Sequence, residues 1–540
     1  MKKSDKIFIN EWLSIKPYKK QVKTDYYYLK LSNDIKSILE KNASDEFFKY
    51  IDKQIDFDAF CCFIASYFED IISNTNIWNS FIKLHTRIYN KKLPFYNVDE
   101  YFDNEINQQD VAFLIWYFIN GYDDDLFLNP NSDFILQAST LIMTILEKEF
   151  EYAPENEFLY SFYQLNDNEN DFYIARNYID KILFQSYLFF YDTNMRLYES
   201  NAEILEKKKN KEHLLMFLNE NRDSLLHKSS TKLLALKGNV WAAEILGNKK
   251  PVSVDLLQMS PKITGLFLYK GHDSKDIFIE HIASGKKFNM TKKSYDNIHL
   301  LKEIDLIMFI GIVKWRDEWW FSGVNSISPY DPDIILDEKN SIASRSQVNF
   351  IDYQTTDIND YLNKQFNVFL KYNKGQQIAF LHSDKINEFI RKYVEFFNKS
   401  LNLSDKEIEE ALQRARKDGF LENDDNQKFD FKHNSESGLV FFNPISGIEI
   451  AMNINSAFPM ENNPFYNLKD SIEDFEALLM SDSLSKELLM FCIETCKDKL
   501  IFFNDNIGEI YIENIDFLSR FWKKESYYSK PSITLTGLQD

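Results

Sequence analysis

The run Ile263-Thr264-Gly265-Leu266-Phe267-Leu268-Tyr269 opens the longest stretch of this chain that is rich in β-forming residues, residues 263–324. Short polar turns, such as Gly271-His272-Asp273-Ser274 and Ala283-Ser284-Gly285-Lys286, interrupt this stretch. The pattern predicts five strands, at residues 263–269, 277–282, 287–290, 304–315 and 319–324. Short strands with tight turns indicate a small curled sheet or barrel of the SH3-like kind. Gly265, Gly311 and Gly323 fall inside the strands, where bends would help the sheet to close.

The sequence before this stretch is predicted to be helical. Apolar residues three and four positions apart predict helices over residues 59–72, 76–88, 110–119, 132–150, 172–191 and 194–219. The last helix of this block is expected to begin at the cap Ser229-Ser230-Thr231 and to end at Gly247 and Pro251. A domain boundary is therefore expected near residue 250.

The sequence after the β-rich stretch mixes both kinds of element. A polar connector is expected over residues 326–356, followed by helices over 357–370, 385–401 and 404–417 and a polar loop over 422–434. Two hairpins are predicted, one from 439–442 and 448–454, the other from 500–503 and 509–512. Helices are expected over 471–480, 483–496 and 515–523.

These patterns define the expected fold class and domains. A chain of 540 residues is too long for a single hydrophobic core. We expect an all-helical domain at 1–250, a small β-barrel-like domain with its connector at 251–350, a helical segment at 351–430 and an α+β domain at 431–540. The fold class is α+β multidomain, mostly helical, with a small SH3-like β-barrel insert and a C-terminal α+β unit.

Charge and hydropathy restrict the partners of the protein. Lys and Arg total 63 against 83 Asp and Glu, so the formal net charge is −20. A field of this sign repels phosphate, which disfavours non-specific binding of nucleic acid and anionic lipid. The basic start Met1-Lys2-Lys3 lacks the apolar core of a signal peptide, and the longest apolar run, residues 111–119, is too short to span a bilayer. We expect a cytoplasmic protein that makes no membrane contact.

Catalytic and metal-binding motifs are absent from the sequence. No phosphate-binding glycine loop, H-E-x-x-H or G-x-S-x-G occurs, so we expect no cofactor and assign no catalytic residue. The acidic runs 123–125 and 166–171 lack the glycine and the final glutamate of calcium loops. Cys61, Cys62, Cys492 and Cys496 have no histidine nearby and are expected to be buried free thiols.

The best candidate for a binding site is a basic island within the β-rich stretch. Residues 261–300 hold seven lysines against four acidic residues. The candidate binding residues are Lys286, Lys287, Lys292, Lys293, His272, Trp315, Trp319 and Trp320. Lysines beside exposed aromatic rings can hold nucleic acid or an acidic peptide. Two other interpretations stay open: buried tryptophans with a solvated lysine rim, or an island that docks on the chain's own acidic helices.

Several short motifs resemble a family of unknown function. Trp12-Leu13, Lys16-Pro17-Tyr18 and Thr24-Asp25-Tyr26-Tyr27-Tyr28-Leu29-Lys30-Leu31 are similar to the start of an uncharacterised bacterial family. Tyr269-Lys270-Gly271 and Glu280-His281-Ile282-Ala283-Ser284-Gly285-Lys286 are similar to its middle. The resemblance implies a bacterial intracellular protein with no assigned reaction.

Three functions are therefore compared below. The leading hypothesis is a non-enzymatic, cytoplasmic interaction protein that holds an unknown protein partner. The first alternative is an enzyme with an unrecognised inter-domain site of carboxylates and histidines, whose side chains would converge with shifted pKa values. The second is nucleic-acid binding through the basic barrel, which would weaken steeply with salt.

Overall fold

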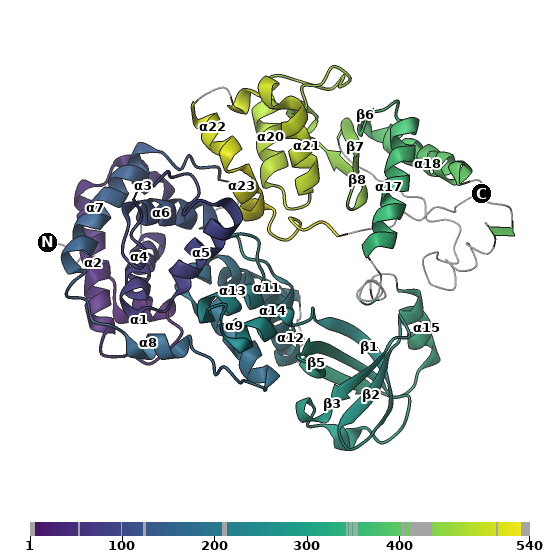
Figure 1. The fold of residues 1–540 in the computed structure, drawn as a ribbon, viewed down its shortest axis with the longest axis horizontal. Helices are drawn as coiled ribbons and strands as arrows, with labels where there is room; N and C mark the ends of the chain where they lie inside the picture. Colours follow the sequence, from purple (N-terminus) through teal and green to yellow (C-terminus); the bar gives the residue numbers. More distant parts are fainter. Residues whose placement is uncertain are drawn as a thin grey trace. The chain divides into compact units, whose positions relative to one another are not determined.

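The computed structural model places the chain in two compact units. The first, called here the helical unit, comprises Met1–Pro261, Lys314–Asp317 and Ile510–Lys524, and the second comprises the remaining residues (Figure 1). The structure describes residues 6–530 except 52–54, 99, 123–125, 208–212, 342–343, 345–347, 349–354, 402–405, 408, 410–434 and 504–505. The acidic run 123–125, the helix expected over 404–417 and the loop over 422–434 lie wholly or largely outside the described residues.

Helices α1 to α14 build the helical unit, as the sequence predicts. Their bounds are α1 Ile9–Ser14, α2 Asp25–Asn42, α3 Asp45–Tyr50, α4 Ile55–Ser73, α5 Ile77–Tyr89, α6 Gln108–Tyr122, α7 Asp133–Glu149, α8 Glu157–Phe162, α9 Phe172–Gln185, α10 Tyr187–Phe189, α11 Met195–Lys207, α12 Leu214–Lys228, α13 Gly238–Leu246 and α14 Pro251–Gln258, with the π-helical turn η1 Phe190–Asn194 after α10. Every residue of α6 from Asp110 to Gly121 is buried, because this helix is apolar on all sides and lies in the core.

The C-terminal part of the chain completes the helical unit. Helix α22 (Asn506–Glu513) and helix α23 (Ile515–Trp522) lie far from α6 in the sequence. Phe517 and Phe521 of α23 are buried, and their rings lie 6.2 and 5.0 Å from the ring of Trp116 in α6. Phe517 also packs against Phe95, at 5.6 Å between ring centroids. Aromatic contacts of this kind supply large areas of core burial.

A buried polar network holds α1, α2 and α4 together. The indole of Trp12 and the hydroxyl of Tyr18 donate hydrogen bonds of 2.9 and 2.8 Å to Oδ1 of Asp25. The amine of Lys16 forms an ion pair with Glu69 and donates a hydrogen bond of 3.0 Å to Ser66. All these side chains are buried, so each polar group depends on its neighbours rather than on water.

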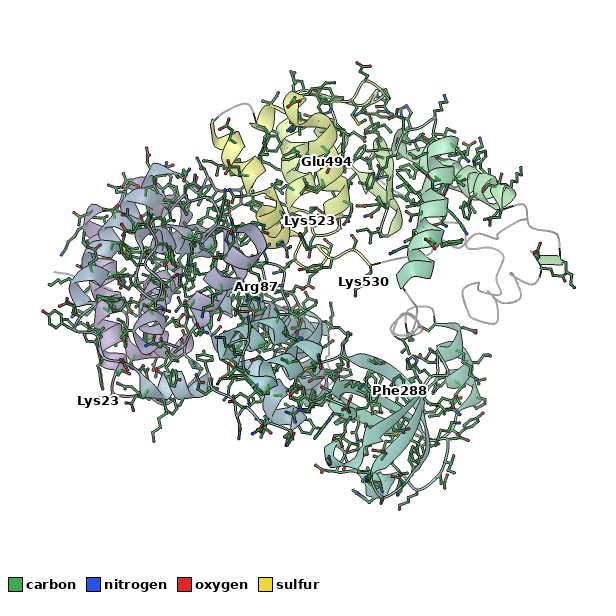
Figure 2. The ribbon with its side chains drawn as sticks, in the orientation of Figure 1. Lys23, Arg87, Phe288, Glu494, Lys523 and Lys530 are labelled. Carbon is green, nitrogen blue, oxygen red and sulfur yellow. The ribbon has the colours of Figure 1, made fainter. Side chains whose placement is uncertain are left out.

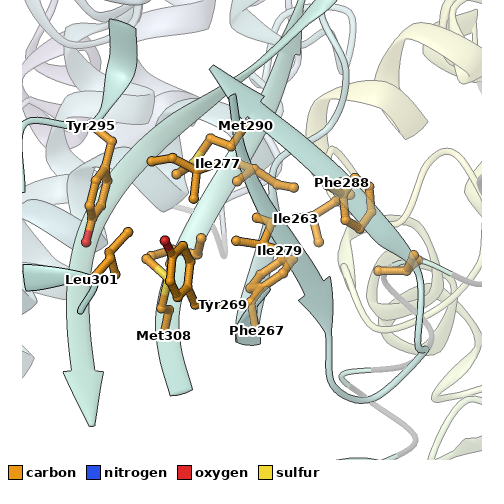
Figure 3. Close-up of a cluster of buried hydrophobic side chains, with 13 residues drawn as sticks. Ile263, Phe267, Tyr269, Ile277, Ile279, Phe288, Met290, Tyr295, Leu301 and Met308 are labelled. Carbon is orange, nitrogen blue, oxygen red and sulfur yellow. The ribbon is translucent and has the colours of Figure 1, made fainter. Parts of the chain in front are cut away.

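The predicted barrel is confirmed. Its strands are β1 Ile263–His272, β2 Asp276–His281, β3 Lys287–Thr291, β4 Ile307–Trp315 and β5 Glu318–Ser328. The sheet closes in the order β1-β2-β3-β5-β4, and the closing contact between β3 and β5 is parallel, with Met290 opposite Trp319. Alternate residues fill the interior, among them Phe267, Ile277 and Met308 (Figure 3).

Two glycines permit close contacts in the barrel. A Cβ atom on Gly311 would lie 2.3 Å from Cε of Lys262 and 2.5 Å from the carbonyl oxygen of Ser322. A Cβ atom on Gly265 would lie 3.0 Å from Nε2 of His281. Side chains at these positions would displace their neighbours, so the glycines allow the strands and the buried His281 ring to pack.

The buried His281 side chain makes barrel stability depend on pH. Burial lowers the pKa of His281 from 6.5 to about 4, so the folded barrel disfavours the imidazolium. The unfolded chain binds the proton more readily between these values, so stability is complete above pH 6.5 and declines as the pH falls to 4. The expected loss is up to about 3 kcal/mol. Chemical unfolding followed across this pH range should show the slope in the native protein.

Two histidine variants isolate this effect. His281→Asn removes this titration, so it should reduce the slope between pH 6.5 and 4, and the slope that remains includes the contribution of His85, whose pKa burial also lowers to about 4. The exposed His299 serves as the control, and His299→Gln should keep the slope. An unchanged slope in His281→Asn would contradict the assignment.

The rest of the second unit is a small three-stranded sheet with helices. Its elements are α15 Pro332–Asn340, α17 Thr355–Tyr372, β6 Ile378–His382, α18 Ser383–Ser400, β7 Ser437–Asn443, β8 Gly447–Met452, α20 Ser471–Met480 and α21 Lys486–Cys496. The sheet is antiparallel in the order β6-β7-β8 (Figure 1). Phe369 of α17 and Tyr393 of α18 pack with Val440 and Phe442 on one face, while Phe441 contacts Phe491 of α21 on the other. The predicted α+β character of this part is confirmed.

Several local predictions were wrong because tertiary contacts override local signals. The second hairpin does not form: residues 501–503 are a 3-10 turn and residues 509–512 lie in α22. The helix predicted over 194–219 is two helices, and α12 follows His213, whose φ of 61° is left-handed. Strand β6 lies between two predicted helices and was missed. The connector over 326–356 contains α15, capped by the Asp331 side chain.

The expected cap at residues 229–231 was also wrong. Helix α12 ends at Lys228, and α13 begins at Gly238. The hydroxyl of Thr231 donates to the carbonyl oxygen of Leu233 and accepts from the indole of Trp241, so it is committed to a buried turn. A Cβ atom on Gly238 would lie 2.5 Å from Leu183, so close packing against α9 favours glycine at the start of α13.

Candidate functional site

The three candidate tryptophans do not share an exposed face with the lysines. Trp315 is 1% exposed and Trp320 is 5% exposed. Trp319 is half-buried, packs against the barrel core, and its ring lies 4.9 Å from that of Phe288. Figure 2 labels Phe288 among the strands of the barrel. Trp319 points inward, so the alternation of β5 directs Trp320 outward, where it is nonetheless buried. The tryptophans therefore act mainly in packing.

The four candidate lysines lie at the solvent side of the barrel among acidic residues. Lys293 pairs with Glu318 at 2.8 Å, and the amine of Lys292 donates to the backbone carbonyl oxygen of Asp273. Lys287 is exposed and lies opposite Glu280 in the register of β2 and β3. Lys286 is half-buried, with its amine 5.9 Å from the centre of the Phe288 ring. The basic island is therefore a surface of mixed charge.

The histidines of the barrel occupy separate places. His272 is exposed at the end of β1, and its Nδ1 shares a hydrogen bond with the hydroxyl of Tyr269. His281 is fully buried, with Nδ1 at 2.9 Å from the hydroxyl of Ser284. The candidate residue His272 therefore lies at the rim of the barrel, whereas His281 lies in its interior.

One exposed feature of the barrel was missed from the sequence. Ile277 and Ile279 point into the core, so Phe278 between them points outward and is half-buried. The register places Phe278 between Gly271 of β1 and Asn289 of β3. A Cβ atom on Gly271 would meet no atom within 4 Å, so open space lies beside the ring. The alternation of side chains along residues 276–281 already predicts that Phe278 points away from the core.

We call this surface the β2–β3 wall. It consists of Asp276, Phe278, Glu280, Lys287 and Asn289. An aromatic centre surrounded by charges of both signs is typical of protein interfaces, where a few anchors dominate and the rim is polar. Phosphate recognition, in contrast, depends on an excess of positive charge.

The helical unit contains buried carboxylic acids whose pKa values are raised by their burial in the core. Burial raises the pKa of Asp110 to about 7, while Tyr67 and Tyr101 donate hydrogen bonds to its carboxylate. Burial also raises the pKa of Asp70, which accepts bonds from Thr75 and Tyr187. These carboxylates are at most 2% exposed, so their shifts reflect desolvation in the core. Within the described ranges, no group of three or more His, Cys, Asp or Glu side chains is arranged to hold a metal ion.

The four cysteines are buried and free, as expected. Burial raises the pKa of Cys61 and Cys492 well above the usual value for a thiol. Buried thiols with raised pKa values are poor nucleophiles, which favours a packing role for Cys61 and Cys492. The pKa of Cys496, in contrast, is lowered to about 7 by its hydrogen bond with Cys492.

The fold and this surface define a protein with a helical unit, a closed five-stranded barrel and a small α+β part. Residues 6–265 match the model of a family described as "Protein of unknown function (DUF3843)". The resemblance carried by residues 12–31 is thus confirmed, whereas the motifs at 269–286 lie beyond the matched residues. No curated protein and no solved structure matches the chain. Among the described helices, none combines the length and apolar character needed to cross a membrane.

Proposed function

We propose that this protein is a non-enzymatic binding protein that holds another protein against the β2–β3 wall of its barrel. The single observation that carries the proposal is the outward Phe278 ring, half-buried beside the open space at Gly271. Burying a partly exposed aromatic side chain stabilises a complex by the hydrophobic effect, with a contribution that grows with the area covered.

The charges around Phe278 favour a protein as the partner. Asp276 and Glu280 lie on β2, and Lys287 lies on β3 opposite Glu280. This pattern fits a partner surface that also carries both signs of charge, since complementary rim charges set orientation and association rate. A phosphate backbone would meet the two carboxylates as well as the lysine, so nucleic acid is the weaker alternative.

The proposal places the protein in the cytoplasm. Cys61, Cys62, Cys492 and Cys496 are free and buried in the structure, which fits a reducing compartment. The enzymatic alternative is less favoured, because Asp70 and Asp110, whose pKa values burial raises, are core residues.

Affinity capture tests the proposal. The tagged full chain is used to capture partners from a lysate of the source organism, and the captured protein is identified, purified and titrated back calorimetrically. Phe278→Ala should weaken the measured affinity by about thirty-fold or more, as expected for an interface anchor worth about 2 kcal/mol. Reversing the charge of Lys286, Lys287, Lys292 and Lys293 together should abolish capture, because it makes the rim uniformly acidic.

A matched control separates this surface from net charge. Lys19, Lys20, Lys23 and Lys30 are exposed lysines of the helical unit, and reversing all four changes the net charge by the same amount. This control should retain partner capture. Equal affinity of the Phe278→Ala variant and the native chain would refute the proposal, and an affinity for nucleic acid that falls steeply with salt would support the alternative.

A further inference from the structure

A cavity in the helical unit is lined by segments distant in sequence. Its volume is about 430 Å³, which lies in the range of small-molecule sites. Residues 95–97, the first turn of α6, Asn131, helix α7 and Ile510 of α22 form its walls. The C-terminal part of the chain is therefore needed to complete it.

The polar lining of the cavity consists of four amide side chains and the residues Tyr96 and Ser139, whose hydroxyls donate to the carbonyl oxygens of Pro130 and Leu136. Asn97, Gln109 and Asn131 line it, and their side chains make no hydrogen bond with any other described residue. The amide nitrogen of Gln108 donates a bond of 2.8 Å to Thr140. A primary amide offers two donors and one acceptor oxygen, so these side chains provide both kinds of group within one cavity.

The remaining lining is neutral and partly apolar. Ala112, Leu136 and Ile510 contribute aliphatic surface, and no described lining residue carries a charge. A charged ligand would lose hydration here without meeting an opposite charge, which is unfavourable. The lining therefore selects for a neutral ligand.

The loop that carries Asn97 is held rigidly. Phe95 adopts a left-handed φ of 68°, and its backbone N–H donates a bond of 3.1 Å to Oδ1 of Asn514. The hydroxyl of Tyr96 donates a bond of 2.6 Å to the carbonyl oxygen of Pro130, beside Asn131. These contacts hold the backbone next to Asn97 and Asn131 in place before a ligand binds, which reduces the entropy lost on binding.

We infer that this cavity binds a neutral ligand rich in hydroxyl groups, namely a small carbohydrate. Sugar hydroxyls both donate and accept hydrogen bonds, which matches the unengaged amides of Asn97, Gln109 and Asn131. The C–H faces of the sugar rings would pack against Leu136 and Ile510. A peptide is a weaker match, because peptide backbones are bound by strand edges or grooves, and side-chain amides rather than a strand edge line this cavity.

Calorimetric titration and saturation-transfer NMR on the full chain test the inference. The probes are maltose, cellobiose and N,N′-diacetylchitobiose, with glucuronic acid as a charged probe and acetyl-glycyl-glycine amide as a peptide probe. At least one neutral disaccharide should bind, and glucuronic acid should not. Gln109→Ala and Asn131→Ala should each weaken the sugar affinity by about ten-fold, the effect of losing one good hydrogen bond.

Two further variants keep the experiment decisive. Leu136 lies at the rim and is 40% exposed, so Leu136→Trp should fill the cavity and abolish sugar binding without loss of fold. Asn168→Ala removes an exposed amide elsewhere in the same unit and should leave the affinity unchanged. The inference is overturned if none of the three sugars binds, if binding is equal in all variants, or if only the peptide probe binds.

Discussion

Lys16→Met should lower the free energy of unfolding of the helical unit by about 3–5 kcal/mol, the cost of leaving a buried charge without its partner. The Lys16 amine pairs with Glu69, and the two side chains are 3% and 0% exposed. The same amine lies 3.8 Å from the centre of the Trp12 ring and bonds to Ser66. Met is similar in length to Lys, so the variant removes the charge and leaves most of the packing. Urea unfolding of the full chain measures the effect.

The loss should also depend on pH in a defined direction. Burial raises the pKa of Glu69 even with Lys16 present, and removal of the amine would raise it further. A raised carboxyl pKa favours the folded state at low pH, and that advantage is lost as the pH rises through the folded pKa. Hence the destabilisation by Lys16→Met should be smaller at acid pH than at neutral pH.

Two variants act as controls for the buried pair. Lys16→Met combined with Glu69→Gln should recover a large part of the lost stability, because no unpaired charge remains and Asn156 can still bond to the Gln oxygen. Lys19→Met alters an exposed residue nearby and should change stability by less than about 0.5 kcal/mol. A loss below about 1 kcal/mol for Lys16→Met would contradict a stabilising role of the ion pair.

Phe517→Ala should destabilise the helical unit by about 3–5 kcal/mol, the usual cost of truncating a buried aromatic ring. Phe517 is 1% exposed, and its ring contacts those of His85, Phe95 and Trp116. Hydrogen exchange of α5 and α6 should report the loss, since these helices carry the contacts. The result would show that a segment from the end of the chain supports a core built mostly from its first half.

An exposed aromatic residue provides the comparison. Tyr152 in the same unit is 76% exposed, and Tyr152→Ala should leave the exchange rates and stability nearly unchanged. Equal, small effects of the two substitutions would mean that α23 contributes little to the core.

The motifs that carry the family resemblance have a structural explanation. Trp12, Lys16, Tyr18 and Asp25 meet in the buried network between α1, α2 and α4. Asn156 extends the network, since its amide bonds to the hydroxyl of Tyr18 and to Glu69. These polar residues are buried and mutually bonded, so substitutions here are costly for stability.

Local patterns in the sequence were sufficient for most of the elements. The strict alternation around Ile277 and Ile279 predicted a strand, and helical spacing predicted α6, α7 and α18, because each signal depends only on residues a few positions apart. A short apolar segment such as 509–512 is compatible with either a strand or a helix, so the local pattern could not decide between them. In the structure this segment is part of helix α22.

The features of the candidate site were likewise predicted from the sequence only in part. Exposure of Lys287 and Lys293 follows from their place near polar turns, and the sequence was enough to predict it. Burial of Trp315 and Trp320 was one of the interpretations that the sequence left open, and only the tertiary structure decided it, because burial depends on which side chains cover these rings. The amide-lined cavity likewise needs Gln109, Asn131 and Ile510 together, and Ile510 lies far from the other two in sequence. Local periodicity thus determined most of the elements and indicated the barrel, whereas long-range packing decided which tryptophans are buried and which side chains meet in a cavity.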